Sequence, residues 1–496
     1  MKTLFLSPPS FEGFDGGAGA RYQARREIRS FWYPTWLAQP AACTPNSKLI
    51  DAPPDDVTIE QTLAEAKSCD QVVIHTSTPS FANDCKVAEA IKKQKPETII
   101  AFCGAHTQVL PEQTLKGSWA IDYVSRKEFD FVFAEVAEGR PLEQVQGITY
   151  KKRNPKDAAP GRNGEQIITN PDRPLIPNLD VLPSVMDVYK RDLTIENYAI
   201  GYLLHPYISL YTGRGCPALC TFCLWPQTIG GHTYRTRSAQ SVVDEMTRAK
   251  EMFPQVKEFF FDDDTFTANP RRAIEIGKGL NAKGITWSCN ARANLGYDTL
   301  KQLKDAGLRL MLVGYESGND HILENIKKGV STEQMLKFTK HCRDLGILIH
   351  GTFILGLPGE TRETIKKSIE FAKTLDVFSI QVSLAAAYPG TELYNQAIAN
   401  GWMKQQERVD SHGIQEAMLE YEGLTRQEIF DSVSVMYNKF YFRPRPIGRI
   451  VKTMLQDSNV CKRRLREGYE FFKFMATRKQ HSPPPSAQSV GQPAAA

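Results

Sequence analysis

Short apolar runs in the first third of the chain alternate with segments whose apolar residues recur at helical spacing. The runs at residues 2–6, 49–51, 71–77, 98–104 and 121–124 predict strands, and residues 86–94 have the spacing of a helix. Strands that alternate with helices favour a parallel, doubly wound sheet. We therefore expect an α/β domain at residues 1–140.

A second and longer series of the same kind covers residues 201–400. Apolar runs predict strands at 207–211, 258–261, 285–289, 308–314, 348–355 and 378–384, with helical patterns near 239–252, 270–282, 298–306, 332–345, 360–374 and 391–400. Six strand–helix units predict a parallel sheet that curls as a partial (β/α)6 barrel. Chemistry in such sheets takes place at the carboxyl ends of the strands.

The remaining segments have other patterns. Residues 141–200 contain a polar Pro/Gly stretch at 151–164 and are expected to form a linker with a small hairpin. Residues 401–478 are expected to be mainly helical. Residues 479–496 have no large apolar residue except Val490, which predicts a disordered tail.

Composition limits the function classes. The chain has 496 residues, of which 41% are hydrophobic and 24% charged, as in ordinary globular proteins. A net charge of +5 is small for this length and gives no argument for nucleic acid as a partner. No run of 18 apolar residues predicts a membrane span, and Pro8 and Pro9 cut short the first apolar run, so we expect no secretory signal and a cytoplasmic location.

Three of the ten cysteines, Cys216, Cys220 and Cys223, lie within eight residues in the pattern C-x3-C-x2-C. Thiolates bind iron–sulfur clusters or zinc, and three thiolates would leave the fourth iron of a four-iron cluster open. The motif follows the first predicted barrel strand, at the catalytic end. The alternatives are three unrelated thiols or a structural zinc site, with His205 or His232 as the fourth ligand.

This motif, with Phe222 before its last cysteine, resembles the signature of the radical S-adenosylmethionine (radical SAM) enzymes. The resemblance implies a [4Fe–4S] cluster on the three cysteines, with Phe222 beside the cofactor. It also implies that the open iron binds S-adenosylmethionine and that a reducing partner such as flavodoxin or ferredoxin supplies an electron. Cleavage of S-adenosylmethionine then yields a 5′-deoxyadenosyl radical that takes a hydrogen atom from the substrate.

Residues after the second and third barrel strands also match this family. The resemblance implies that one of Asp262, Asp263 and Asp264 meets the ammonium group of S-adenosylmethionine, although acids that cap the next helix are the alternative. Arg292 could bind the methionine carboxylate through two hydrogen bonds, or it could be an ordinary surface arginine.

Residues after the fourth and fifth strands match as well. The segment 314–318 (GYESG) resembles a turn that contacts the ribose, which makes Glu316 and Ser317 candidates. The segment 351–360 (GTFILGLPGE) resembles a motif whose backbone holds adenine, which makes Gly356 a candidate. A structural turn is the alternative interpretation of this segment, and the two are compatible. The turn at 388–391 (YPGT) is expected to be structural.

The N-terminal domain resembles the cobalamin-binding domain of one class of these enzymes, in residues 4–9, 104–110 and 121–139. Bound cobalamin is therefore compatible with the sequence. The D-x-H-x-x-G signature that supplies a cobalt-ligating histidine is absent, and residues 134–138 (AEVAE) replace a glycine-containing turn. A lone histidine at a strand end, such as His75 or His106, is more often a hydrogen-bonded structural residue. We therefore expect that catalysis does not require cobalamin.

The stretch 11–20 (FEGFDGGAGA) and the aromatic segment 31–34 (FWYP) resemble most closely the radical SAM proteins associated with hopanoid biosynthesis. This implies a hopanoid lipid substrate and the ring contraction of a glucosamine headgroup to an aminocyclopentitol. A cobalamin-dependent radical SAM methyltransferase shares nearly every motif and is the first alternative, which the mass of the product would distinguish. A non-enzymatic iron–sulfur or zinc module is the second.

The C-terminal region combines positive charge with aromatic residues. Phe471, Phe472 and Phe474 accompany eight basic residues, namely Arg443, Arg445, Arg449, Lys452, Lys462, Arg463, Arg464 and Arg466. A basic face beside aromatics is typical of peripheral contact with an anionic membrane, here the inner face of the cytoplasmic membrane. The alternative is a solvated helix that packs its aromatic side chains on the barrel.

Overall fold

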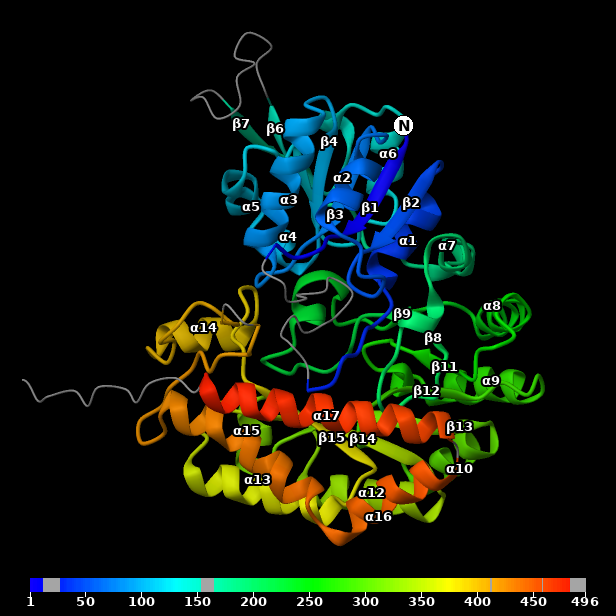
Figure 1. The fold of residues 1–496 in the computed structure, drawn as a ribbon, viewed down its shortest axis with the longest axis vertical. Coiled ribbons are helices and arrows are strands. Elements are labelled where there is room, and N and C mark those ends of the chain that lie inside the picture. Colours follow the sequence, from blue (N-terminus) through cyan, green and yellow to red (C-terminus); the bar gives the residue numbers. More distant parts are fainter. Residues whose placement is uncertain (12–26, 153–164, 411–412, 457, 482–496) are drawn as a thin grey trace, which may run out of the picture.

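The computed structural model describes residues 1–11, 27–152, 165–410, 413–456 and 458–481. An N-terminal α/β unit lies above a second sheet, and the first of three long C-terminal helices packs against that second sheet (Figure 1). Most of the stretch 11–20, most of the predicted loop at 151–164 and the predicted tail from residue 482 onward lie outside the described residues.

The first sheet has the strand order β2-β1-β3-β4-β5-β6-β7, which confirms the doubly wound α/β prediction for its first five, parallel strands. The strands are β1 (Thr3–Ser7), β2 (Ser47–Asp51), β3 (Gln71–His75), β4 (Ile99–Cys103), β5 (Tyr123–Ser125), β6 (Ile148–Lys152) and β7 (Gln166–Thr169). The helices are α1 (Thr35–Cys43), α2 (Ile59–Ala66), α3 (Phe81–Gln94), α4 (Ala105–Val109), α5 (Pro111–Gly117) and α6 (Val132–Ala137).

This sheet is buried on both faces, which explains why its strands are continuous apolar runs. Phe5 and Val73 point into a core that extends to the second sheet, whereas Leu4, Leu6 and Val72 point into a separate core beneath α3. Neighbouring residues of a strand face opposite sides, so a strand covered on both sides needs no polar alternation.

The second sheet has six parallel strands in the order β15-β14-β13-β12-β11-β8 and confirms the partial (β/α)6 barrel. Its strands are β8 (Tyr207–Leu210), β11 (Glu258–Phe261), β12 (Trp287–Ala291), β13 (Leu308–Glu316), β14 (Leu348–Leu355) and β15 (Ser379–Leu384). The helices are α8 (Ala239–Met252), α9 (Pro270–Asn281), α10 (Tyr297–Asp305), α11 (Asp320–Asn325), α12 (Thr332–Asp344), α13 (Arg362–Leu375) and α14 (Glu392–Ala399).

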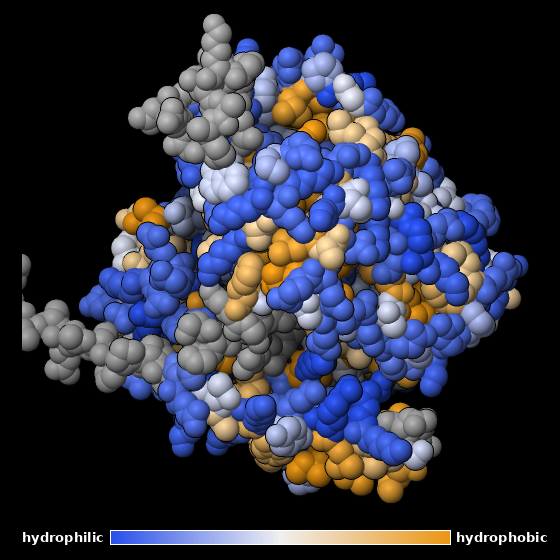
Figure 2. Space-filling model, turned by 45° about the horizontal axis from the view of Figure 1, so that its top comes forward, coloured by the Kyte–Doolittle hydropathy of each residue, from blue (hydrophilic) through white to orange (hydrophobic). Residues whose placement is uncertain are grey.

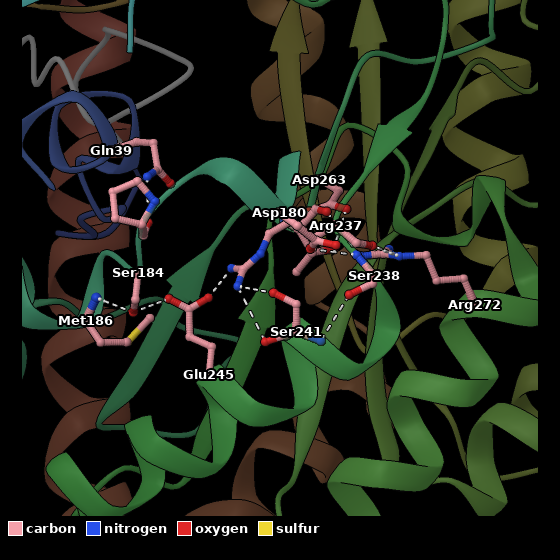
Figure 3. Close-up of polar contacts among 12 residues, drawn as sticks. Gln39, Asp180, Ser184, Met186, Arg237, Ser238, Ser241, Glu245, Asp263 and Arg272 are labelled. Carbon is pink, nitrogen blue, oxygen red and sulfur yellow. Dashed lines mark hydrogen bonds and ion pairs between the residues drawn. The ribbon is translucent and has the colours of Figure 1, made fainter. Parts of the chain in front are cut away.

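The segment predicted as a linker is part of the folded body. Its hairpin, β6 and β7, extends the first sheet because β6 pairs antiparallel with β5. The residues before α7 (Met186–Asp192) form hydrogen bonds with α8 and with the residue before it. The hydroxyl of Ser184 donates to Glu245, which also pairs with Arg237 (Figure 3). The N–H of Ser238 donates to Asp180 over 2.9 Å. The position of the domain boundary remains a prediction.

Side chains, not another strand, cover the outer edge of β15. The hydroxyl of Tyr441 accepts from the N–H of Ile380 over 3.0 Å, and that of Tyr437 accepts from the N–H of Val382 over 2.9 Å. Gln415 exchanges two hydrogen bonds with the backbone of Leu384. These contacts satisfy polar groups that an open sheet edge would leave unpaired.

The C-terminal region is helical from residue 426 only. It consists of α15 (Arg426–Tyr441), α16 (Pro444–Gln456) and α17 (Ser458–Gln480). The expectation of a mainly helical region is confirmed, although isolated antiparallel bridges join extended segments in the described residues between 401 and 425, such as the bridge between Met403 and Leu419. None of the helices in the described ranges has the length and apolar character that a membrane span needs.

Candidate active site

The three clustered cysteines lie on the loop that follows β8, at the carboxyl edge of the second sheet. Cys216 and Cys220 are buried and Cys223 is half-buried. Gly215 enters the loop with φ +87°, and a Cβ at this position would lie 2.3 Å from the carbonyl oxygen of Thr233. Any other residue would force the loop apart at its entry, so this glycine fixes the path of the cysteine segment.

Gln227 holds the cysteine loop closed. Its side-chain amide donates to the carbonyl oxygens of Cys220, Thr221 and Cys223 over 3.1, 3.2 and 2.8 Å. Its amide oxygen accepts from the N–H of Glu392 over 2.8 Å, which links the loop to the start of α14. Sequence reasoning missed this residue because its partners include backbone groups 165 positions away.

The cysteine sulfur atoms have polar neighbours from two further strand ends. The Sγ of Cys216 lies 3.4 Å from the hydroxyl oxygen of Thr265, and Arg292 donates from Nη1 to the Sγ of Cys220 over 3.7 Å. Hydrogen bonds to sulfur are one means by which proteins tune the reduction potential of an iron–sulfur cluster.

The donor set fits a [4Fe–4S] cluster better than zinc. Among the described residues, no three His, Cys, Asp or Glu side chains converge as ligands of a single ion. A cluster does not need such convergence, because each thiolate bonds to a different iron atom. His232 faces the carbonyl oxygens of Cys216 and Ala218 through Nδ1, and His205 lines a separate pocket with Lys257, so neither histidine completes a zinc site.

The three aspartates after β11 differ in their surroundings. Asp263 is wholly buried, and its carboxylate accepts from the backbone and hydroxyl of Thr212 over 2.6 and 2.8 Å and from Tyr234 over 2.6 Å. Burial raises the pKa of Asp263, against the lowering effect of Arg272 and of these hydrogen bonds. Asp262 accepts from Asn290 over 2.9 Å, and Asp264 is only partly buried.

The residues predicted after β12 and β13 also lie at this edge. Arg292 donates from Nη2 to the backbone carbonyl of Lys328, and Lys328 forms a buried ion pair of 2.8 Å with Glu316. β13 extends as far as Glu316, which has φ +63°. The hydroxyl of Ser317 is wholly buried and lies 3.2 Å from that of Ser368 on α13.

The last two candidates are Gly356 and Phe222. Gly356 has φ +87°; its N–H donates to Glu360, and its carbonyl accepts from Tyr421 over 2.9 Å, so both of its backbone polar groups already have partners. The side chain of Phe222 is partly buried and packs against the main core.

A pocket joins the carboxyl edge of the first sheet to the cysteine loop. Residues that follow β3 and β4 form one wall, and the turn at 388–391 together with two residues directly after Cys223 forms the other. The lining residues are His75, Thr76, Ser77, Thr78, Pro79, Ala105, His106, Val109, Leu110, Leu224, Trp225, Tyr388 and Pro389. Ligands of doubly wound sheets bind at this edge.

The two histidines of this pocket differ. His106 has Nδ1 3.1 Å from the hydroxyl of Thr78, as expected of a structural histidine. The expectation was wrong for His75: both of its ring nitrogens are buried and lack a hydrogen-bond partner within the described part of the chain. Burial lowers the pKa of His75 to about 4, so its imidazole is neutral at pH 7. A buried polar group without a partner is costly, and a ligand or an ordered water at this wall would satisfy it.

The two sheets are locked together beside this pocket. Arg214, on β9 (Gly213–Arg214), donates two hydrogen bonds to Asp130 over 2.6 and 2.8 Å, and both side chains are buried. The ring of Trp36 stacks on that of Trp225 with centroids 4.9 Å apart. The cysteine loop therefore has a fixed position relative to the N-terminal sheet.

Comparisons with known proteins agree with this geometry. The family model of the radical SAM superfamily matches residues 210–372. The chain is 32% identical to an uncharacterised methyltransferase of Pyrococcus horikoshii over 90% of this chain and 93% of that protein. It is 26% identical to the hopanoid C-3 methylase of Methylococcus capsulatus over 62% of this chain and 57% of that protein. The chain belongs to the radical SAM superfamily.

A solved structure extends the likeness to the whole fold. The radical SAM methyltransferase TsrM of Kitasatospora setae, solved with cobalamin and a [4Fe–4S] cluster, superposes with a TM-score of 0.64 at 15% identity over 96% of this chain and 99% of that one. The protein is thus an enzyme whose cofactors include a [4Fe–4S] cluster and S-adenosylmethionine.

Proposed function

We propose that the protein is a cobalamin-dependent radical SAM methyltransferase. The observation that carries the proposal is the pocket lined both by loops of the N-terminal sheet and by Leu224 and Trp225, directly after Cys223. A group bound at the edge of the first sheet would lie beside the cluster loop. The cluster and S-adenosylmethionine would supply the radical that activates a C–H bond of the substrate, and cobalamin would supply the methyl group.

The chain's own residues fit this arrangement. Gly104 has φ +116°, and a Cβ there would lie 2.4 Å from the carbonyl oxygen of Thr76, so the turn that forms the pocket wall is closely packed. The unpartnered ring of His75 belongs to the same wall. His75 could therefore contact cobalamin without a D-x-H-x-x-G signature, which weakens our reason for expecting catalysis without cobalamin.

The substrate class that we propose is a hopanoid lipid, on the basis of the relative from Methylococcus capsulatus. Ring contraction of a sugar headgroup remains the second candidate, because the histidine signature is missing and residues 134–138 lie in or next to α6 instead of a glycine turn. The relatives favour methylation over ring contraction, because two of those compared above are a methyltransferase and a methylase.

We assign the contacts with S-adenosylmethionine to Asp262 or Asp264, together with Arg292 and Glu316. The proximity of Arg292 to Cys220 supports this assignment, since the open iron lies on the same cluster. Asp263 and Ser317 are wholly buried in protein hydrogen bonds, and Gly356 has no free backbone group, so we assign these three to support of the strand ends.

The reaction is tested with S-adenosylmethionine that carries a deuterated methyl group. Anaerobic wild-type protein, reconstituted with cluster and hydroxocobalamin and given a hopanoid extract and a reductant, is expected to transfer the labelled methyl group to a lipid, detected by mass spectrometry. The same mixture without cobalamin is the control and should give no labelled lipid. A headgroup product without label, formed equally in both mixtures, would establish ring contraction and reject methyl transfer.

The aspartates give a second test, of the assigned cofactor contacts. Asp262→Asn or Asp264→Asn should weaken binding of S-adenosylmethionine by about 10–100-fold, the value of a charged hydrogen bond of roughly 1.5–3 kcal/mol. Asp263→Asn is the matched control and should lower the stability of the protein with little effect on affinity. Calorimetric titration of the reconstituted protein measures the affinity. The assignment fails if only Asp263→Asn weakens binding.

A further inference from the structure

An ordinary surface helix buries its apolar side and exposes its polar side. Helix α16 has the opposite orientation. One of its two arginines faces the protein: Arg449 donates to the carboxylate of Asp376 over 3.1 Å and to the carbonyl oxygen of Val377 over 2.9 Å. Arg443, just before the helix, lies 3.6 Å from the same carboxylate. Asp376 ends α13, so cationic side chains meet the negative end of that helix.

The apolar residues of α16 face solvent. Ile447, Ile450, Val451 and Leu455 are 47%, 39%, 46% and 83% exposed. Residues 447, 451 and 455 follow one another at intervals of four and residue 450 lies three after 447, which places all four along one side of a helix. Figure 2 shows a gathering of hydrophobic residues over α16, along the lower edge of the molecule, with a strongly hydrophilic band directly above it.

Helix α17 continues this apolar surface. Leu465, Tyr469 and Phe472 are 60%, 69% and 59% exposed, whereas Phe474 is buried. Phe442, which lies between α15 and α16, contacts Phe472 of α17, and their ring centroids lie 6.1 Å apart. The two sequence-based alternatives for this region therefore apply to different residues: some aromatic side chains pack on the protein, and others project from it.

The surroundings of this surface are basic. Residues 442–480 contain eleven Lys and Arg against three Asp and Glu, a net charge of +8 in a chain of net charge +5. The side chain of Arg445 is 82% exposed and that of Arg466 is 57% exposed. Lys452 and Lys462 are exposed as well. The remainder of the chain is thus net negative, and the positive charge is concentrated where the apolar side chains are exposed.

We propose that the α16–α17 pair docks on an anionic membrane surface, with its exposed apolar side chains among the acyl chains and its lysines and arginines at the headgroups. Apolar side chains framed by cations match the boundary of an anionic bilayer. A second copy of the chain would bring the two sets of cations together, and a nucleic acid would leave the apolar residues unsatisfied. The proposal does not depend on which reaction the enzyme catalyses.

The test is flotation of the full-length protein with two kinds of vesicle: phosphatidylcholine alone, and phosphatidylcholine mixed with phosphatidylglycerol. The wild type should float with the mixed vesicles, and high salt should weaken the binding. Ile447→Ser/Leu455→Ser should bind about tenfold or more weakly, because less apolar area enters the bilayer. Arg445→Gln/Lys452→Gln should also bind more weakly and should respond less to salt.

The control is Ile398→Ser/Lys283→Gln, which changes an exposed apolar residue on α14 and an exposed lysine after α9 and should bind as the wild type does. Circular dichroism checks that every variant is folded. The proposal is overturned if the wild type does not float with anionic vesicles, or if Ile447→Ser/Leu455→Ser floats as well as the wild type. A wild-type dimer that Ile447→Ser/Leu455→Ser abolishes, with no vesicle binding by either protein, would also overturn the proposal. Equal binding of RNA by the wild type and by this variant would overturn it as well.

Discussion

Protein in which Cys216, Cys220 and Cys223 are all replaced by Ala will contain no [4Fe–4S] cluster after anaerobic reconstitution and will not cleave S-adenosylmethionine. The three thiols are expected to be the only protein ligands of the cluster, so their removal leaves nothing to bind iron. Iron analysis and the visible absorbance of the reconstituted protein measure the first effect. The formation of 5′-deoxyadenosine under reducing conditions measures the second.

The matched control is the double substitution of Cys43 and Cys461 by Ala, because these two cysteines are half-buried like Cys223 but lie outside the motif. It should keep the full iron content and the cleavage activity. Retention of four irons by the triple variant would show that the cluster has other ligands. Loss of iron in the control would show that simple removal of thiols, not removal of the motif, disturbs reconstitution.

The second large effect is expected at the contact between the two sheets. Arg214→Met leaves the carboxylate of Asp130 buried without its cation, and breaking a buried ion pair on one side typically costs about 3–5 kcal/mol. The midpoint of urea unfolding should therefore fall clearly. Near-ultraviolet circular dichroism should also change, because Trp36 stacks on Trp225 beside this arginine and lies under its guanidinium.

Two further variants make this prediction specific. Arg248→Met removes a pair with Asp187 whose side chains are 51% and 60% exposed, and it should cost less than about 1 kcal/mol. Arg214→Met/Asp130→Leu removes both charges and should recover part of the lost stability, because no uncompensated charge stays buried. Equal losses in Arg214→Met and Arg248→Met would mean that the buried pair has no special role in joining the sheets.

Most strands and helices could be predicted from the sequence where the local pattern of apolar residues agrees with their burial in the folded protein. The strands at 258–261 and 348–355 were predicted with the bounds that the structure has, because each is a compact apolar run between turn signals. The hairpin of β6 and β7 was found, but its place in the first sheet was not, since pairing of β6 with β5 depends on tertiary contacts. Helix α1 was missed, and it contains Pro40.

Residues of the candidate active site could be predicted only where their spacing along the sequence marks them as a group. Cys216, Cys220 and Cys223 stand out because their spacing alone predicts shared ligands. Lys328 could not have been found, since its partner Glu316 comes from another element of the barrel and nothing local marks the pair. The three adjacent aspartates looked equivalent in sequence, whereas in the structure Asp263 is the one buried under hydrogen bonds from Thr212 and Tyr234.

The tyrosines that cover β15 have a consequence for the behaviour of the protein in concentrated solution. An exposed edge strand offers a row of unpaired backbone groups to any other extended chain. Because Tyr437 and Tyr441 reach this row from α15, the N–H groups of Ile380 and Val382 are already paired within the chain and are not free to bind a neighbouring molecule. The C-terminal helices thus protect the catalytic sheet against strand-to-strand aggregation, and a chain truncated before residue 426 would lack that protection.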